Sequence, residues 1–281
     1  MKNILDAVKN LVTRNNIDLK IFGVADNRIN SVGYGLENYV KNLFADTFDC
    51  TENERLINWS KIFSYIGNDN NPPDIMLRNG DAVEVKKIQS KDSALALNSS
   101  YPKHILKVSD SMISNACRSA ENWSEKDLIY AVSVVQNNKL KHLCMIYGRN
   151  YCASEECYNK IREQIKHGVE NIPAVKFSPT RELGRVNNTD PLGITYLRIR
   201  GMWHIENPWK VFEYIYQRNF QAKFDFMCII DDEKWLTLEN RDEFMEFQKN
   251  YPALKISDVK IKNPDNPAQL KDAKLIAYEI G

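Results

Sequence analysis

Apolar residues recur every three or four positions in several segments of the chain, the spacing of one face of an α-helix. Residues 4–12 have this spacing first, and residues 36–44 repeat it, with Gly33 and Gly35 at the entrance of the second segment. We predict helices over 4–12, 36–44, 111–123, 153–169, 209–218 and 241–250.

Short apolar runs bounded by turn-forming residues lie between these segments and predict strands. The run at 128–135 is apolar without alternation, which is typical of a strand buried on both faces. Segments 68–73 and 173–195 are rich in Asn, Pro and Gly and are expected to be irregular. We predict strands over 75–77, 82–86, 128–135, 143–147, 195–200, 224–230 and 275–280.

Interspersed helices and strands favour an α/β or α+β sheet domain. No internal repeat and no low-complexity linker divides the sequence. We therefore expect residues 1–281 to form a single domain.

The composition is that of an ordinary soluble globular protein, with 43% apolar residues and a formal net charge of +1. This balance argues against a non-specific polyanion binder, but it allows a local basic face. No segment approaches the roughly 18 apolar residues of a membrane span. Residues 1–10 lack the apolar core of a signal peptide, so we expect a cytoplasmic protein without membrane contact. The histidines are isolated and the closest cysteines, Cys152 and Cys157, have no second pair nearby, so we expect no zinc site.

One segment combines a turn signal with clustered charges. Asn79-Gly80 separates two short apolar runs, which is the strongest local signal of a hairpin. Pro73-Asp74 precedes the first run, and Glu84-Val85-Lys86 ends the second. Since strand side chains alternate between faces, Glu84 and Lys86 share one face about 7 Å apart, and the hairpin returns Asp74 beside them. Two carboxylates and an ammonium group then converge on one small site.

The length of the turn decides whether the three side chains meet. A two-residue turn at Asn79-Gly80 pairs Asp74 with Val85, and Asp74 then points away from Glu84, because directly paired residues share a face. A three-residue turn or a bulge places Asp74 opposite Glu84 or Lys86 instead. We predict one of these two arrangements.

Such a cluster suits phosphodiester hydrolysis. Carboxylate oxygens are the ligands that Mg²⁺ prefers, and the bound metal lowers the pKa of a water and polarises the phosphate. Lys86, kept protonated by the carboxylates, orients that water and stabilises the developing charge. We assign Asp74, Glu84 and Lys86 as catalytic, and Asp74, Glu84 and Val85 as metal ligands.

Glu37, on the helix predicted over 36–44, is a further catalytic candidate. It is suited to serve as an additional metal ligand or to orient a metal-bound water. A surface ion pair with Lys41, four residues along the helix, explains Glu37 equally well.

The acidic motif has low specificity by itself. An acidic residue two positions before a lysine occurs five times, and the full pattern recurs at Pro264-Asp265 and Asp272-Ala273-Lys274. We expect this second copy to lie in an irregular loop without a first strand, so that its charges do not converge. The alternative for Glu84 and Lys86 is an exposed ion pair on a surface hairpin, which contributes little energy.

A second group of charges lies between residues 181 and 200. Arginine and asparagine side chains pair with guanine and adenine edges in the major groove, and aspartate accepts from cytosine. The alternative is a solvated loop and an amphipathic strand whose arginines pair with Glu182 or Glu206. The predicted DNA-binding residues are Arg181, Arg185, Asn187, Asn188, Asp190, Arg198 and Arg200.

The catalytic motif, together with the helix that carries Glu37, resembles the PD-(D/E)xK nuclease superfamily. More narrowly, the chain is similar to the NgoPII-type type II restriction endonucleases, and this resemblance covers most of its length. The stretches that carry it are GYGLENYVKNLFADTF (33–48), FSYIGNDNNPPDIMLRNGDAVEVKKIQS (63–90), LALNSSYPK (95–103), ELGRVNNTDPLGITYLRIRGMWHIENP (182–208) and VFEYIY (211–216).

The resemblance implies an α/β fold with a central mixed β-sheet flanked by helices and with added DNA-recognition elements. A catalytic core over about 30–150 and a recognition elaboration over about 173–220 are expected. The resemblance further implies a homodimer whose subunits each cut one strand of double-stranded DNA at a short palindrome, GGCC, and a companion DNA methyltransferase acting on the same site.

Residue by residue, Asp74 and Glu84 match the family's metal ligands and Lys86 its catalytic lysine, whereas Glu37 matches only loosely. The alternatives are a structure-selective or repair nuclease on the same scaffold, or a non-catalytic DNA-binding protein.

Overall fold

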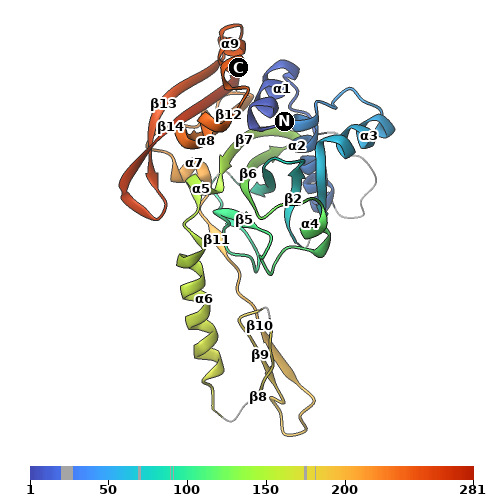
Figure 1. The fold of residues 1–281 in the computed structure, drawn as a ribbon, viewed down its shortest axis with the longest axis vertical. Helices are drawn as coiled ribbons and strands as arrows, with labels where there is room; N and C mark the ends of the chain where they lie inside the picture. Colours follow the sequence, from blue (N-terminus) through green and yellow to red (C-terminus); the bar gives the residue numbers. More distant parts are fainter. Residues whose placement is uncertain (20–27, 69–70, 89, 91, 174–175, 181) are drawn as a thin grey trace.

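The computed structural model describes residues 1–19, 28–68, 71–88, 90, 92–173, 176–180 and 182–281. Within these residues a nine-stranded sheet forms the body, in the order β1-β2-β3-β6-β7-β12-β14-β13, with β5 paired to β6 (Figure 1). The pairs β3–β6 and β7–β12 are parallel and the other neighbours are antiparallel, so the sheet is mixed. Its strands are β1 (Phe63–Asn68), β2 (Asn71–Leu77), β3 (Ala82–Ile88), β5 (Ile105–Lys107), β6 (Glu125–Gln136), β7 (Lys139–Tyr147), β12 (Phe224–Asp231), β13 (Leu254–Asn263) and β14 (Asn266–Ile280).

Helices flank this sheet, as the predicted α/β architecture requires. The first of them, α1, begins at a capping box, in which the Asn3 side chain accepts from the backbone of the first turn and Asp6 bonds back to Asn3. Among the described helices none is long and apolar enough to span a membrane. The helices are α1 (Ile4–Arg14), α2 (Arg28–Ala45), α3 (Glu52–Ile62), α4 (Asn115–Ser119), α5 (Gly148–Tyr151), α6 (Glu155–Glu170), α7 (Pro208–Val211), α8 (Asp232–Thr237) and α9 (Arg241–Lys249).

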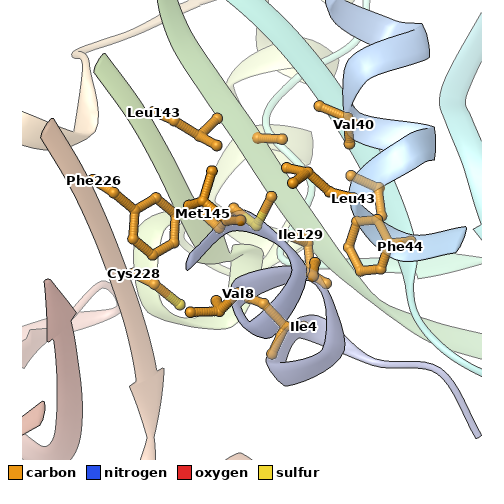
Figure 2. Close-up of a cluster of buried hydrophobic side chains, with 14 of the residues drawn as sticks. Ile4, Val8, Val40, Leu43, Phe44, Ile129, Leu143, Met145, Phe226 and Cys228 are labelled. Atoms are coloured by element: carbon orange, nitrogen blue, oxygen red, sulfur yellow. The ribbon is translucent and has the colours of Figure 1, made fainter. Parts of the chain in front are cut away.

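Both faces of the sheet are buried, which accounts for the continuous apolar run over 128–135. Ile129 and Ala131 point into one core cluster, and Leu128 and Tyr130 into a second cluster on the other face. Figure 2 shows the first cluster, where α1 and α2 pack side chains such as Phe44 against strands β6, β7 and β12. The catalytic candidates on β2 and β3 are therefore attached to a sheet that is fixed from both sides.

A long projection extends away from this body (Figure 1). It consists of α6 and a three-stranded antiparallel sheet of β8 (Lys176–Phe177), β9 (Gly184–Asn187) and β10 (Tyr196–Ile199). We call residues 155–200 the arm. At its base, β4 (Leu95–Ala96) pairs with β11 (His204–Ile205), which ties the returning chain to the segment before β5.

Several predicted boundaries differ from the structure. The helices predicted over 111–123 and 209–218 shorten to α4 and α7, while α2 begins at Arg28, so Gly33 and Gly35 lie inside it. The segments expected to be irregular contain strands, since β2 already begins at Asn71 and β8 and β9 lie within 173–195. Strand β13 was not predicted, because it is an edge strand with most of its side chains exposed or half-exposed, and its sequence has no buried alternation.

Candidate active site

The hairpin of β2 and β3 brings the predicted catalytic residues together. Ile75 pairs with Val83 and Met76 with Ala82, and the amide of Leu77 donates to the carbonyl of Asp81 at 2.9 Å. Three residues, 78–80, therefore form the turn, with Asn79 in the left-handed region at φ 57°. The structure thus has the first of the two predicted arrangements, a three-residue turn rather than a bulge. Continuing the register by one residue places Asp74 opposite Glu84 on the same face.

The three polar side chains are linked by short contacts. Asp74 Oδ2 accepts from the backbone amide of Val85 at 2.6 Å, and Lys86 Nζ lies 2.5 Å from Glu84 Oε1. Glu84 is only 8% exposed, and its second oxygen, Oε2, is buried without a hydrogen-bond partner among the described residues. A buried carboxylate oxygen without a donor is costly, so this atom is suited to bind a cation.

The electrostatics of the cluster are dominated by burial and by the two neighbouring carboxylates. Burial raises the pKa of Asp74 well above its ordinary value, and the charge of Glu84 raises it further, although Lys86 opposes both. Burial lowers the pKa of Lys86, but Glu84 and Asp74 outweigh this and leave the pKa raised. Lys86 is therefore a permanent cation at neutral pH, and the site carries carboxylate repulsion that a metal ion would relieve.

Glu37 lies close enough to change the pKa values of this cluster. It also forms the ion pair with Lys41 that was the alternative explanation for this residue. Its Oε2 is 3.9 Å from Lys41 Nζ, while its charge raises the pKa of both Asp74 and Lys86. Burial lowers the pKa of Lys41, and Glu37 and Asp74 oppose this change. Helix α2 thus contributes a carboxylate and a buried lysine to the surroundings of the site.

A small cavity of about 80 Å³ opens at this cluster. Asp74, Glu84 and Lys86 line it together with residues from the segment before β5, among them Tyr101 and Lys103. Sequence reasoning missed Lys103. The only signal for it was its position at the end of the stretch 95–103, within the family resemblance.

The donor set of the cavity fits a hard divalent cation that keeps part of its water shell. Asp74 and Glu84 supply carboxylate oxygens, and the only atom that Val85 can offer is its backbone carbonyl oxygen. In the described part of the chain, no group of three or more His, Cys, Asp or Glu side chains is arranged to hold a metal. The cavity therefore resembles a partly hydrated magnesium site more than a closed structural one.

The second copy of the motif does not form a comparable site, but the predicted reason was wrong. Asp265 sits in the turn between β13 and β14, so strands flank it on both sides. Its carboxylate accepts from the amide of Ser154 at 2.7 Å, and Asp272 pairs with the exposed Lys260. The acidic residues of this copy thus have separate partners on an edge hairpin and do not converge on one site.

The arm gathers part of the predicted DNA-binding set on one face of its small sheet. Arg185 pairs directly with Arg198, and Asn187 with Tyr196, so these four side chains share a face. The Arg185 guanidinium lies over the Tyr196 ring, 4.6 Å from its centroid.

Other members of the predicted set have structural partners. Arg198 and Arg200 both bond to Glu182, each at 2.6 Å, which is the pairing that was weighed as the alternative. Asp190 accepts from the backbone of Leu192 and Thr195 and so holds the loop before β10. Asn188 begins that loop in the left-handed region, and Arg181 lies outside the described residues.

Comparison with known proteins gives a consistent result. The model of the family described as NgoPII restriction endonuclease matches residues 2–262. The type II restriction enzyme NgoPII of Neisseria gonorrhoeae is 56% identical over 279 residues, which cover 99% of this chain and 100% of that protein. No solved structure matches.

Proposed function

Since the chain belongs to the NgoPII restriction endonuclease family, we propose that it hydrolyses DNA with Mg²⁺ at the cavity formed by Asp74, Glu84 and Lys86. Membership makes the protein a type II restriction enzyme, a hydrolase that cuts DNA at a specific sequence within a restriction–modification system. The observation that carries the proposed site is the convergence of a buried carboxylate, a half-buried carboxylate and a protonated lysine on one cavity.

The roles of the residues follow from their chemistry, and the cluster corresponds to the PD-(D/E)xK pattern. Asp74, Glu84 and the carbonyl of Val85 would hold Mg²⁺, which supplies an acidified water and a polarised phosphate when bound. Lys86 keeps its proton because both carboxylates face it, so it stabilises negative charge on the phosphate oxygens instead of acting as a base. Glu37 acts on Asp74 through its charge, and its proposed role is to orient a water near Asp74.

Sequence recognition is proposed for the arm. The shared face of Arg185, Asn187 and Arg198 offers donors that match guanine and adenine edges in a major groove. We propose GGCC as the site and a homodimer as the active form, because a two-fold palindrome matches a two-fold protein in which each subunit cuts one strand. A DNA methyltransferase that modifies the same site would protect the host.

Plasmid cleavage tests the site assignment. The wild-type protein should cut DNA containing GGCC into discrete fragments with Mg²⁺ and leave it intact in EDTA. Asp74→Ala and Lys86→Ala should each lower the rate by about 10² to 10³, the usual loss of one group that stabilises transition-state charge. Asp272→Ala is the matched control, because it removes the acidic residue of the second motif copy, and it should cut normally. Discrete bands persisting in both Asp74→Ala and Lys86→Ala would overturn the assignment.

A separate substrate series tests the recognition sequence. Duplexes that differ only in one base pair of GGCC should resist cleavage, as should duplexes methylated within it. Cleavage of all of them at similar rates would contradict the proposed specificity without affecting the catalytic assignment.

A further inference from the structure

The catalytic cavity contains a second lysine that the proposed mechanism leaves without a role. Lys103 lies in the segment between β4 and β5, and its residue is only 4% exposed. It lines the same cavity as Asp74, Glu84 and Lys86. Lysine is among the residues least often fully buried, so its position at this cavity requires an explanation.

Lys103 is held in place from three directions. Its ammonium lies 2.5 Å from Asp110 Oδ2 and 3.7 Å from the centre of the Tyr101 ring. Its backbone amide donates to the hydroxyl of Tyr130 at 2.7 Å, and Tyr130 is the β6 residue paired with Glu84 on β3. The lysine is thereby tied to β6, the strand next to the one that carries Glu84.

Stability alone does not account for this arrangement. A buried ion pair gains little over apolar residues of similar volume, because the cost of desolvating both charges offsets their attraction. The ammonium group has three N–H donors, and among the described residues Asp110 is its only salt-bridge partner. The Nζ atom is itself buried and, apart from the contact with Asp110, has no hydrogen-bond partner among the described residues, so donors are left unsatisfied at the wall of the cavity.

We propose that Lys103 is a second cationic substrate contact of the active site, whose ammonium binds a non-bridging oxygen of the DNA phosphate that enters this cavity. The inference rests on the proposed function of Asp74, Glu84 and Lys86. Asp110 and Tyr101 act as positioning residues, which hold the lysine before DNA arrives and so reduce the ordering cost at binding.

The location of Tyr101 adds a consequence. Its ring stacks on Tyr158 of α6 at 5.5 Å and meets the edge of Trp203 at 6.3 Å. Tyr158 lies in the first turn of the arm, and Trp203 lies just after the arm in the chain. Tyr101 therefore contacts the residues at the base of the arm as well as Lys103. The phosphate contact is therefore located at the junction of the catalytic cavity and the proposed recognition element.

Substitution by methionine, which keeps the length of the side chain and removes its charge, tests this role. Lys103→Met should lower the single-turnover cleavage rate of a GGCC duplex by at least about tenfold. With Ca²⁺ in place of Mg²⁺, the slope of log affinity against log salt should fall by about 0.9, the loss of one phosphate contact. Lys103→Arg should recover part of both effects. Lys249→Met, which removes an exposed lysine of α9 paired with Glu246, should change neither. An unchanged rate and slope in Lys103→Met would overturn the proposal.

A purely structural role for Lys103 makes a different prediction. If the lysine only neutralises Asp110, the double variant Lys103→Met with Asp110→Leu should cut like the wild type. If it binds phosphate, the double variant should be as slow as Lys103→Met. The cleavage rate of Asp74→Ala is measured alongside. If Asp74→Ala cuts at the wild-type rate, the proposed catalytic site is wrong. If Asp74→Ala loses activity but Lys103→Met does not, only the role of Lys103 is refuted.

Discussion

Gly67 offers a way to move the catalytic aspartate without changing any catalytic side chain. It lies on β1, at the irregularity between Ile66 and Asn68 in the pairing with β2. A Cβ atom at this position would stand 2.5 Å from the carbonyl oxygen of Pro73 and 3.2 Å from Cα of Asp74. Both atoms belong to the backbone, so neither can move away by rotating a side chain. Gly67→Ala should therefore displace the segment that carries Asp74.

The size of the displacement follows from ordinary contact distances. The contact with Pro73 is about 0.9 Å shorter than the 3.4 Å of a normal van der Waals contact, so the backbone has to shift by a similar amount. A misplacement of about 1 Å at a catalytic group lowers rates by roughly 10². Overpacking of this kind costs about 1–3 kcal/mol of stability, which leaves a folded protein in most cases.

Single-turnover cleavage of a GGCC duplex, combined with urea unfolding, separates the two effects. Gly67→Ala should cleave about 100-fold more slowly under conditions where unfolding shows it to be fully native. Gly168→Ala on α6 is the control, because nothing lies within 4 Å of its added Cβ, and it should match the wild type. A folded Gly67→Ala protein that cleaves at the wild-type rate would refute the argument that activity depends on where Asp74 stands.

Three further predictions concern the charges of the molecule. Burial and the charge of Glu84 raise the pKa of Asp74 well above its ordinary value, so the native state holds a proton that the unfolded chain releases. The free energy of unfolding without metal should therefore fall as pH rises through the raised pKa. Asp74→Asn should abolish this pH dependence in urea unfolding with EDTA, and an identical pH profile in both proteins would contradict the prediction. Lys234 lies 2.7 Å from Asp81 and 2.8 Å from Asp127. Lys234→Met should cost about 3–5 kcal/mol in chemical unfolding, because the buried Asp81 loses its cationic partner, while Asp127 keeps Arg149. Loss of the exposed Lys249–Glu246 pair should cost less than about 1 kcal/mol. Glu182 pairs with Arg198 and Arg200, which are proposed DNA contacts. If that proposal holds, Glu182→Gln should free these arginines and bind duplexes without GGCC several-fold more tightly in fluorescence anisotropy; unchanged binding would place these arginines away from DNA.

The catalytic hairpin could be predicted from sequence because its determinants are local. Alternation fixes Glu84 and Lys86 on one face, and the turn residues limit where Asp74 can return. The prediction of either a three-residue turn or a bulge followed from requiring Asp74 to share a face with Glu84, and the structure has the three-residue turn. Asp74, the turn and Lys86 all lie within one short segment of the chain, residues 74–86.

Lys103 could not be predicted because nothing local distinguishes it from a solvated loop lysine. Its position depends on Tyr130, 27 residues away, and on Asp110. Strand β10 of the arm was predicted, over 195–200, but β8 and β9 were missed for a related reason. They are only two to four residues long, and one face of their sheet carries polar side chains, so they lack the apolar alternation that identifies a half-buried strand.

The turn end of the catalytic hairpin is held by side chains from elsewhere in the fold. Lys126 donates to the carbonyl of Gly80 at 2.6 Å, and Glu121 accepts from the amide of Asn79 at 2.9 Å. Asp81, which follows the turn, accepts from the hydroxyl of Tyr147 at 2.8 Å. The turn is thus fixed by β6, β7 and the segment before them, independently of the charges at the other end of the hairpin.

Because the turn end of the hairpin is fixed by other parts of the fold, the open end can carry two neighbouring carboxylates that destabilise it. At the open end, the charge of Glu84 opposes a second negative charge on Asp74, and repulsion between the two ionised groups would separate two strands that only paired with one another. Here β3 is also paired with β6 over seven residues, from Ala82 to Ile88, and β2 is also paired with β1, so each strand that carries a carboxylate is held by a second neighbour. The pairing within the sheet therefore positions the two proposed metal ligands against each other.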